Sequence, residues 1–438
     1  MQSIREAFVV NHSKKSTFSD IFVIGFALFA MFFGAGNLIF PPYLGMTAGD
    51  KWFSGFLAFV IADGGLAFLT VLAMTRKDGT FWCVIDRIGK LPAKVLATVA
   101  ILTVGPLLCI PRTCATTFEM GLLPLMPNFS SILFSILFFA IVWALTIRPS
   151  AVVDIIGKFL TPILLVILTI LVIVGIISPI GEVSTTQMTE SVVRDGILAG
   201  YQTMDVLVSL AVTLMLVGSA TAKGYTSRKA RATVITKAGF ICLLGLALVY
   251  GGLTYLGATT SGLGLDANIG QAELVVFITE ALLGKTGVVL LSLIVFFACL
   301  TTAVGLVSSS ADFLTEIFGN KFSYTKLVVC ICAFATVIAN FGIGTIIRLA
   351  APILNIIYPI LLTQMLLSFF DKQIPNVNVN RFVAGAVLVM ALMGVLSDFG
   401  VSCLDFVYAL PFAQYGFFWL VPAIMLGIVG AFIPAKSR

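Results

Sequence analysis

Charged residues are scarce in this chain of 438 residues: 11% are Asp, Glu, Lys or Arg, whereas 59% are hydrophobic. About a quarter of the residues in a water-soluble domain are charged, so the composition excludes a surface solvated mostly by water. No long polar stretch remains that could form a second domain. The composition therefore predicts one polytopic domain solvated by lipid.

Residues that bind metals or catalyse reactions are also few. The single histidine, His12, precedes the first apolar segment, so no histidine is available at membrane depth. The 8 cysteines are scattered through mostly apolar segments without the paired spacing of a zinc site, and we interpret them as small packing residues. This scarcity argues against an enzyme and against a metal cofactor.

Apolar runs long enough to cross a bilayer fill most of the chain. A bilayer core of about 30 Å requires about 20 apolar residues in a helix, and lipid permits only helices or closed barrels. The runs are too continuous for barrel strands, and the first is too long for a cleavable signal peptide. The sequence predicts an all-α polytopic membrane protein with about twelve helices, near 18–45, 52–75, 93–121, 129–147, 153–178, 191–218, 231–258, 286–316, 325–341, 345–370, 379–398 and 407–434. Residues 271–283 predict a short helix at the outer surface.

The basic residues lie in alternate connections between the predicted helices. They occur in the leader (Arg5, Lys14, Lys15), in 76–94, at Arg148 and Lys158, in 223–237, at Lys321, Lys326, Lys372 and Arg381, and in the tail (Lys436, Arg438). With an even number of spans, all of these fall on one side, which the positive-inside rule assigns to the cytoplasm. We therefore predict two cytoplasmic termini, and the net charge of +6 requires no nucleic-acid partner.

The first predicted helix contains residues that interrupt helices. Gly34 and Gly36 lower helix propensity, and Asn37 competes for backbone hydrogen bonds. Pro41 cannot donate a hydrogen bond to the carbonyl of Asn37, four residues earlier. Backbone groups freed at membrane depth are tolerated where they line a cavity. The pattern indicates an unwound segment, although a small-residue packing face is the alternative.

The sixth predicted helix has a matching interruption at Gly200-Tyr201-Gln202-Thr203-Met204-Asp205, which places an amide, a hydroxyl and a carboxylate where apolar residues are expected. Paired interruptions in corresponding positions of two halves are the best sequence indication of a carrier's binding site. Two charges inside other spans, Asp63 and Arg112, are also functional candidates. Each fits a purely structural charge equally well.

The residues around these interruptions resemble the branched-chain amino acid:cation symporter family. The resemblance implies uptake of leucine, isoleucine and valine across the cytoplasmic membrane of a bacterium, coupled to a sodium or proton gradient. It covers the predicted helix layout of the whole chain. It rests on Phe33-Gly34-Ala35-Gly36-Asn37 with Phe40-Pro41-Pro42, Gly105-Pro106 with Pro111-Arg112-Thr113, Gly200-Tyr201 with Thr203-Met204-Asp205, and Ala298-Cys299-Leu300 with Thr302-Ala303-Val304-Gly305-Leu306.

The resemblance also implies the LeuT-type architecture, with two five-helix repeats in inverted orientation, discontinuous helices one and six, and two further helices. Accordingly we expect a cytoplasmic leader (1–17), a ten-helix core (18–370, with repeats at about 18–178 and 191–370), and two added helices with a short tail (371–438). No residue-level repeat is visible between the halves, so the symmetry depends on the positions of the interruptions.

The same resemblance implies a sodium site of neutral oxygens, while proton coupling would instead use a titratable group at Asp63 or Asp205. The cation ligands would be the carbonyls of Ala30, Phe33 and Ala298 and the hydroxyls of Thr301 and Thr302. The substrate carboxylate is expected at the N–H groups of a half-helix start, and its ammonium at carbonyls near the second interruption. The expected substrate-binding residues are Ala35, Gly36, Asn37, Gly200, Tyr201 and Thr203.

Three other functions remain open from the sequence. A channel would have rings of charge or a filter repeated by symmetry, whereas the two interruptions differ in sequence. A membrane enzyme would have a nucleophile–base pair or a metal cluster. A carrier of another small neutral solute would share the fold. The choice between Na+ and H+, the stoichiometry and the oligomeric state are also open.

Overall fold

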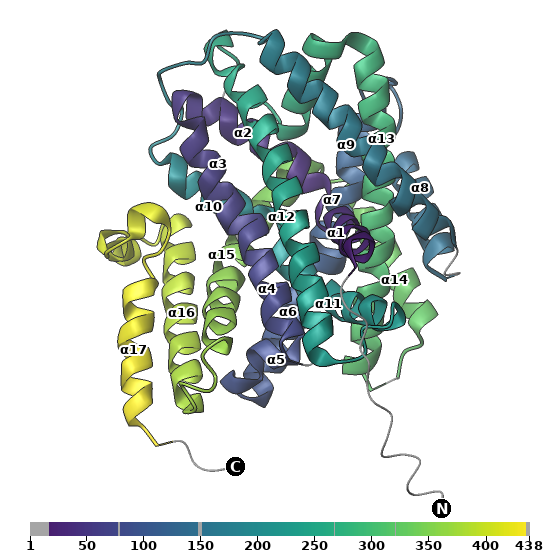
Figure 1. The fold of residues 1–438 in the computed structure, drawn as a ribbon. Coiled ribbons are helices and arrows are strands. Elements are labelled where there is room, and N and C mark those ends of the chain that lie inside the picture. Colours follow the sequence, from purple (N-terminus) through teal and green to yellow (C-terminus); the bar gives the residue numbers. More distant parts are fainter. Residues whose placement is uncertain (1–16, 78, 148–150, 267, 320, 435–438) are drawn as a thin grey trace, which may run out of the picture.

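The computed structural model describes residues 17–77, 79–147, 151–266, 268–319 and 321–434, and of 151–161 it describes the backbone alone. Within these ranges every regular element is a helix (Figure 1). Seven helices are long and apolar enough to cross a membrane, and five shorter apolar helices accompany them. Most of the predicted leader, Arg148 and the tail with Lys436 and Arg438 lie outside the described residues.

The first half of the chain contains interrupted helices that lie close to the predicted spans. Its elements are α1 (Phe18–Phe32), α2 (Ala35–Ala48), η2 (Gly49–Lys51), α3 (Trp52–Val60), η3 (Ile61–Gly65), α4 (Leu66–Thr75), α5 (Trp82–Ile85), η4 (Asp86–Ile88), α6 (Lys90–Leu102), η5 (Thr103–Leu107), α7 (Cys109–Thr116), η6 (Thr117–Leu122), α8 (Ser131–Ile147) and α9 (Ala151–Ile177). Of these, η3, η5 and η6 are π-helical turns within longer helices, a feature that is frequent at functional sites.

The second half begins with another interrupted helix. Its elements are α10 (Val192–Thr203), α11 (Asp205–Ala222), α12 (Arg228–Ala258), η7 (Ser261–Leu263), α13 (Gln271–Ile317), α14 (Tyr324–Ala339), α15 (Ile343–Ser368), α16 (Val377–Asp398), η8 (Ser402–Ala409), η9 (Ala413–Tyr415) and α17 (Leu420–Phe432). Within α13 the backbone leaves helical geometry at Gly284, with φ of 62°. The predicted surface helix 271–283 and the predicted span 286–316 are therefore the two parts of α13.

The prediction of a continuous helix over 407–434 is wrong, because only α17 in this range is an α-helix. Within this apolar run, Phe412 and Gly416 have left-handed backbone geometry, which a continuous α-helix does not allow. Pro411 precedes them. The connection instead folds into the 3-10 turns η8 and η9. This connection is joined to the end of α16 by a hydrogen bond from the hydroxyl of Tyr408 to the carboxylate of Asp398, at 2.6 Å.

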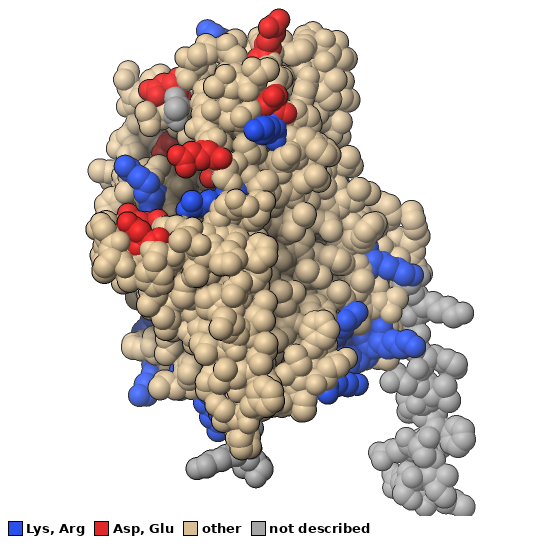
Figure 2. Space-filling view, turned by 90° about the vertical axis from the view of Figure 1, so that its left-hand side faces the viewer, with Lys and Arg blue, Asp and Glu red and all other residues tan. Residues whose placement is uncertain are grey.

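Two sets of connections gather at opposite ends of the helices. At one end, Lys77 and Arg87 both pair with Asp371, and Lys223 pairs with Asp20. Figure 2 shows Lys and Arg side chains, in blue, in both halves of the visible face, and Asp and Glu side chains, in red, only in its upper half. The centre of this face is free of charged side chains, as expected for a surface in contact with lipid.

At the other end, the loops after α2, α9 and α12 join one another. The amide of Asp50 donates to the carbonyl of Ser184 at 2.9 Å, and the amide of Ser184 donates to the hydroxyl of Ser261 at 2.8 Å. These hydrogen bonds hold the three loops together at one end of the molecule.

Close packing of α2 against α12 positions the first interruption. A Cβ atom added at Gly257 would lie 1.8 Å from the carbonyl oxygen of Pro42, and one added at Gly45 would lie 1.9 Å from that of Thr254. Small residues allow helix backbones to approach this closely in membranes. Because α2 carries Asn37 and α12 carries Tyr250, this contact brings both residues to the same depth.

Candidate functional site

The break in the first span is narrow. α1 ends at Phe32, α2 begins at Ala35, and the side-chain oxygen of Asn37 accepts a hydrogen bond from the amide of Gly34 at 3.0 Å. α2 continues through Pro41 and Pro42. The non-helical stretch is thus shorter than the run of glycine, asparagine and proline suggests, because Asn37 caps the new helix at its start.

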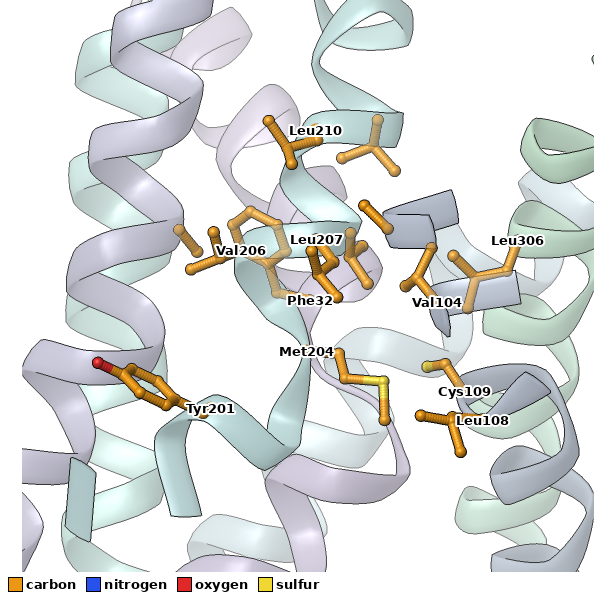
Figure 3. Packing of buried hydrophobic residues seen from close by; sticks show 14 of the residues in the cluster. Phe32, Val104, Leu108, Cys109, Tyr201, Met204, Val206, Leu207, Leu210 and Leu306 are labelled. Carbon is orange, nitrogen blue, oxygen red and sulfur yellow. The ribbon is translucent and has the colours of Figure 1, made fainter. Parts of the chain in front are cut away.

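The break between α10 and α11 is a single residue. Met204 adopts left-handed backbone geometry (φ 71°, ψ 14°) between α10 and α11, which is uncommon for a residue other than glycine. Figure 3 shows the side chain of Met204 at this bend, directed toward Leu108 and Cys109, whereas Tyr201 points the opposite way. Backbone strain of this kind concentrates at functional sites.

Polar side chains from four spans meet between the two breaks, and we call Asn37, Asp63, Thr203, Asp205 and Tyr250 the polar centre. The amide nitrogen of Asn37 lies 2.9 Å from Asp205 Oδ2, 3.5 Å from Asp63 Oδ2 and within hydrogen-bond distance of the Tyr250 hydroxyl. The hydroxyl of Thr203 lies 2.7 Å from Asp63 Oδ1. No member is more than 2% exposed, so the centre is closed to both sides of the molecule.

Arg112 supplies the positive charge next to the polar centre. Its Nη1 donates to the carbonyl of Gln202, and its Nη2 donates to that of Thr203 at 2.9 Å. Its guanidinium lies over the ring of Phe40, 5.7 Å from the centroid. A cation at the C-terminus of a helix is favourable, so Arg112 stabilises the end of α10.

The predicted substrate-binding residues separate into two groups. Ala35 and Gly36 form the first turn of α2, where backbone N–H groups lack partners within the helix. The carbonyl of Gly200 accepts a hydrogen bond from the Thr203 hydroxyl at 2.6 Å. Tyr201 lies apart from the polar centre and stacks on Tyr358, with ring centroids 4.6 Å apart.

The predicted cation ligands lie where α1 approaches α13. The hydroxyl of Thr301 donates to the carbonyl of Ala298 at 2.9 Å. The hydroxyl oxygen of Thr302 is buried and has no hydrogen-bond partner among the described residues. A Cβ atom at Gly34 would lie 3.7 Å from that oxygen, so Thr302 borders the first helix break.

Sequence reasoning missed Tyr250 and Tyr358. Each is a single tyrosine within an apolar segment, and no pattern distinguishes it from a packing residue. The two aspartates and Arg112 were found because charge inside a span is costly. In the described part of the chain, no group of three or more His, Cys, Asp or Glu could hold a metal ion.

The sequence matches the family described as "Branched-chain amino acid transport protein" over residues 17–437. The branched-chain amino acid permease BrnQ of Bacillus subtilis is 35% identical over 433 residues, covering 95% of this chain and 97% of the permease. BraB of the same organism is 36% identical over 94% of each chain. BrnQ of Escherichia coli K12 is 33% identical, again over 94% of each chain.

Two solved structures share the fold. A Na+-coupled sialic acid symporter in a substrate-bound outward-open state superposes with a TM-score of 0.61 at 15% identity, covering 95% of this chain and 91% of the symporter. Mhp1 in an inward-facing conformation gives 0.60 at 16% identity, covering 94% and 90%. The helical arrangement is therefore of the LeuT type. Together with the full-length relatives, this places the chain in the branched-chain amino acid transport protein family, whose members are transporters and not enzymes.

Proposed function

We propose that the protein is a secondary active transporter that carries leucine, isoleucine and valine into the cell together with Na+ or H+. The observation that supports this most directly is the pair of helix breaks, at Gly34 and Met204, joined by the hydrogen bond from Asn37 to Asp205. Such breaks at membrane depth create backbone groups that can bind a small solute. The names of the full-length relatives indicate branched-chain amino acids as that solute.

The proposed topology combines the seven long and five shorter apolar helices into twelve spans. Its first span is α1 with α2 and its sixth is α10 with α11, so both are discontinuous. Residues 18–370 form the transport core, with inverted repeats at about 18–178 and 191–370, and 371–438 add two helices and a tail. The basic connections face the cytoplasm of a bacterial cell, as do the leader 1–17 and both termini.

The proposed substrate site lies between the two breaks. The N–H groups of Ala35 and Gly36, at the positive end of α2, would receive the substrate carboxylate. Thr203 and the carbonyl of Gly200 lie at the end of α10, where the ammonium group would bind. Leucine, isoleucine and valine differ by a methylene group or by branching, worth about 1–3 kcal/mol in an apolar pocket, so we expect little discrimination among them.

If Na+ is the coupled cation, its site would lie between α1 and α13. The hydroxyl oxygen of Thr302 is buried without a hydrogen-bond partner in the described ranges and would gain one. The remaining ligands would be the carbonyls of Ala30, Phe33 and Ala298 and the hydroxyl of Thr301. Cation binding there would join the two helices and favour the outward-open state.

Uptake by the purified protein in liposomes tests the proposal. Labelled leucine should accumulate inside under an imposed Na+ or pH gradient, and unlabelled isoleucine and valine should compete. Empty liposomes and a gradient-free sample are the controls. Absence of accumulation under both gradients would contradict a symporter, whereas transport without saturation would favour a channel. Stronger competition by another amino acid would change the substrate but retain the carrier.

A further inference from the structure

The carboxyl groups of Asp63 and Asp205 lie 3.5 Å and 2.9 Å from the same amide nitrogen, that of Asn37, and both are buried. We propose that Asp63 holds one proton in this closed state, that Asp205 stays ionised, and that this proton is the coupling ion of transport. The inference rests on the proposed function and deepens it, because it selects the ion and names its carrier. It depends on the count of hydrogens, on the charge balance and on the groups that surround the pair.

The orientation of the Asn37 amide decides which carboxyl group receives a hydrogen bond from it. Its oxygen accepts from the Gly34 amide at 3.0 Å, so its nitrogen must face the carboxyl groups. That nitrogen has two hydrogens, which its two closest neighbours, Asp205 Oδ2 and the Tyr250 hydroxyl, receive. The 3.5 Å separation from Asp63 is too long for a strong hydrogen bond. Asp205 therefore has a donor suited to an ionised carboxylate.

Two short hydrogen bonds meet at the hydroxyl of Thr203, and they require two hydrogens. It lies 2.6 Å from the carbonyl of Gly200 and 2.7 Å from Asp63 Oδ1, both distances typical of O–H···O hydrogen bonds. The hydroxyl has a single hydrogen, and the carbonyl of Gly200 can only accept. If Thr203 donates to that carbonyl, the hydrogen between Thr203 and Asp63 must come from Asp63. Asp63 is then a neutral acid that donates to Thr203.

The charge balance gives the same assignment. Asp205 is the first residue of α11, where the partial positive charge of a helix start favours an ionised group. With Asp63 protonated, Arg112 and Asp205 contribute one charge of each sign, and the buried centre is neutral. With both carboxyl groups ionised, one buried negative charge would lack a counter-ion, which is costly inside a membrane.

The other ionisable groups around the pair come from three elements. They are Arg112 and Cys109 on α7, Tyr250 and Cys242 on α12, and Tyr358 on α15. Phenols and thiols are ordinarily neutral at neutral pH, and arginine is always charged. The Tyr358 hydroxyl is buried and makes no hydrogen bond to either carboxyl group within the described residues. One proton on the two carboxyl groups therefore restores neutrality, and the hydrogen count at Thr203 places it on Asp63.

The proton of Asp63 would leave and return once in each transport cycle. When the site opens to the cytoplasm, the O–H bond of Asp63 breaks and its proton passes to water. The hydroxyl hydrogen of Thr203 turns from the carbonyl of Gly200 to the ionised Asp63, which changes the hydrogen bonding at the end of α10. When the site next opens outward, Asp63 takes a proton from the external water. One proton and one zwitterionic amino acid enter in each cycle, carrying one positive charge inward.

The test compares exchange with net uptake in liposomes without Na+. Leucine counterflow at equal pH requires substrate binding and helix movement but no net proton transfer. Accumulation under an acid-outside gradient, with the membrane potential held at zero, requires the proton. At one proton per substrate, each unit of pH gradient should give about tenfold accumulation. The variants are Asp63→Asn, which mimics the neutral acid, and Asp312→Asn as a matched control, because Asp312 is an exposed carboxyl group on α13.

We expect Asp63→Asn to lower pH-driven accumulation far more than it lowers counterflow, while Asp312→Asn retains both. Leucine-dependent alkalinisation of the external medium by the unmodified protein is the second measurement, and it remains decisive if Asp63→Asn fails to fold. Accumulation by Asp63→Asn under a pH gradient that falls no further than its counterflow would overturn the proposal. So would leucine uptake by the unmodified protein that requires Na+ and moves no protons. Failure of counterflow in the unmodified protein would instead contradict the proposed function.

Discussion

A methyl group at Gly257 should force α2 away from α12 and so displace the polar centre. The added Cβ atom would lie 1.8 Å from the backbone oxygen of Pro42, whereas carbon–oxygen contacts normally measure about 3.3–3.6 Å. The helices would have to separate by about 1.5 Å at this point to restore such a contact. Backbone cannot rotate away as a side chain can, so we expect Gly257→Ala to destabilise the fold by about 1–3 kcal/mol, the usual range for overpacking.

The matched control for this substitution is Gly385→Ala. Gly385 lies inside α16, and a Cβ atom there would have no neighbour within 4 Å. Both substitutions gain the same helix propensity, about 1 kcal/mol, so the difference between the variants isolates the contact with Pro42. Thermal unfolding in detergent should show a lower midpoint for Gly257→Ala than for Gly385→Ala, and leucine counterflow should fall only in the former. Equal midpoints and equal counterflow would refute the close α2–α12 contact.

Three further substitutions test other parts of the site. Arg112→Lys should lower leucine counterflow at least tenfold, or by about 1.4 kcal/mol, because lysine cannot reach two carbonyls with a planar fork; unchanged counterflow would show that the bidentate contact is dispensable. Glu119→Ala should lower the unfolding midpoint, since Glu119 accepts from the amide of Ile343 at the start of α15 and such a contact contributes about 1 kcal/mol; an unchanged midpoint would contradict this. Thr302→Ala should raise the half-saturating Na+ concentration if Na+ is coupled, and an unchanged Na+ dependence would remove Thr302 from a cation site.

The sequence predicts the helical elements well because lipid imposes a strong constraint. A helix must be apolar over about 20 residues to cross the bilayer, so α6 through η6, α8, α12 and α16 lie within a few residues of the predicted spans. The same constraint makes a charge conspicuous, which is why Asp63, Asp205 and Arg112 were identified as candidates. Their meeting at one point could not be derived, because it depends on how η3, α7 and α11 pack.

Two features of the structure escape prediction from the sequence for the same reason. The apolar connection before α17 has the composition of a span, and its two left-handed residues, Phe412 and Gly416, carry no sequence signal strong enough to break it. Tyr250 likewise resembles its apolar neighbours, although it contacts Asn37 in the polar centre. Hydropathy measures how apolar a segment is. It does not indicate where the backbone leaves helical geometry or which hydroxyl group contacts a polar side chain.

Asn37 contacts both helix breaks, which lie far apart in the sequence. Its oxygen caps the start of α2, and its nitrogen donates to Asp205 at the start of α11. Withdrawal of the Asn37 oxygen from Gly34 by rotation of the amide would also remove its nitrogen from Asp205. The charge of Asp205 would then lose its nearest donor, which favours either a new cation or the return of Asn37. A single side chain thus joins the first break to the carboxyl group at the second.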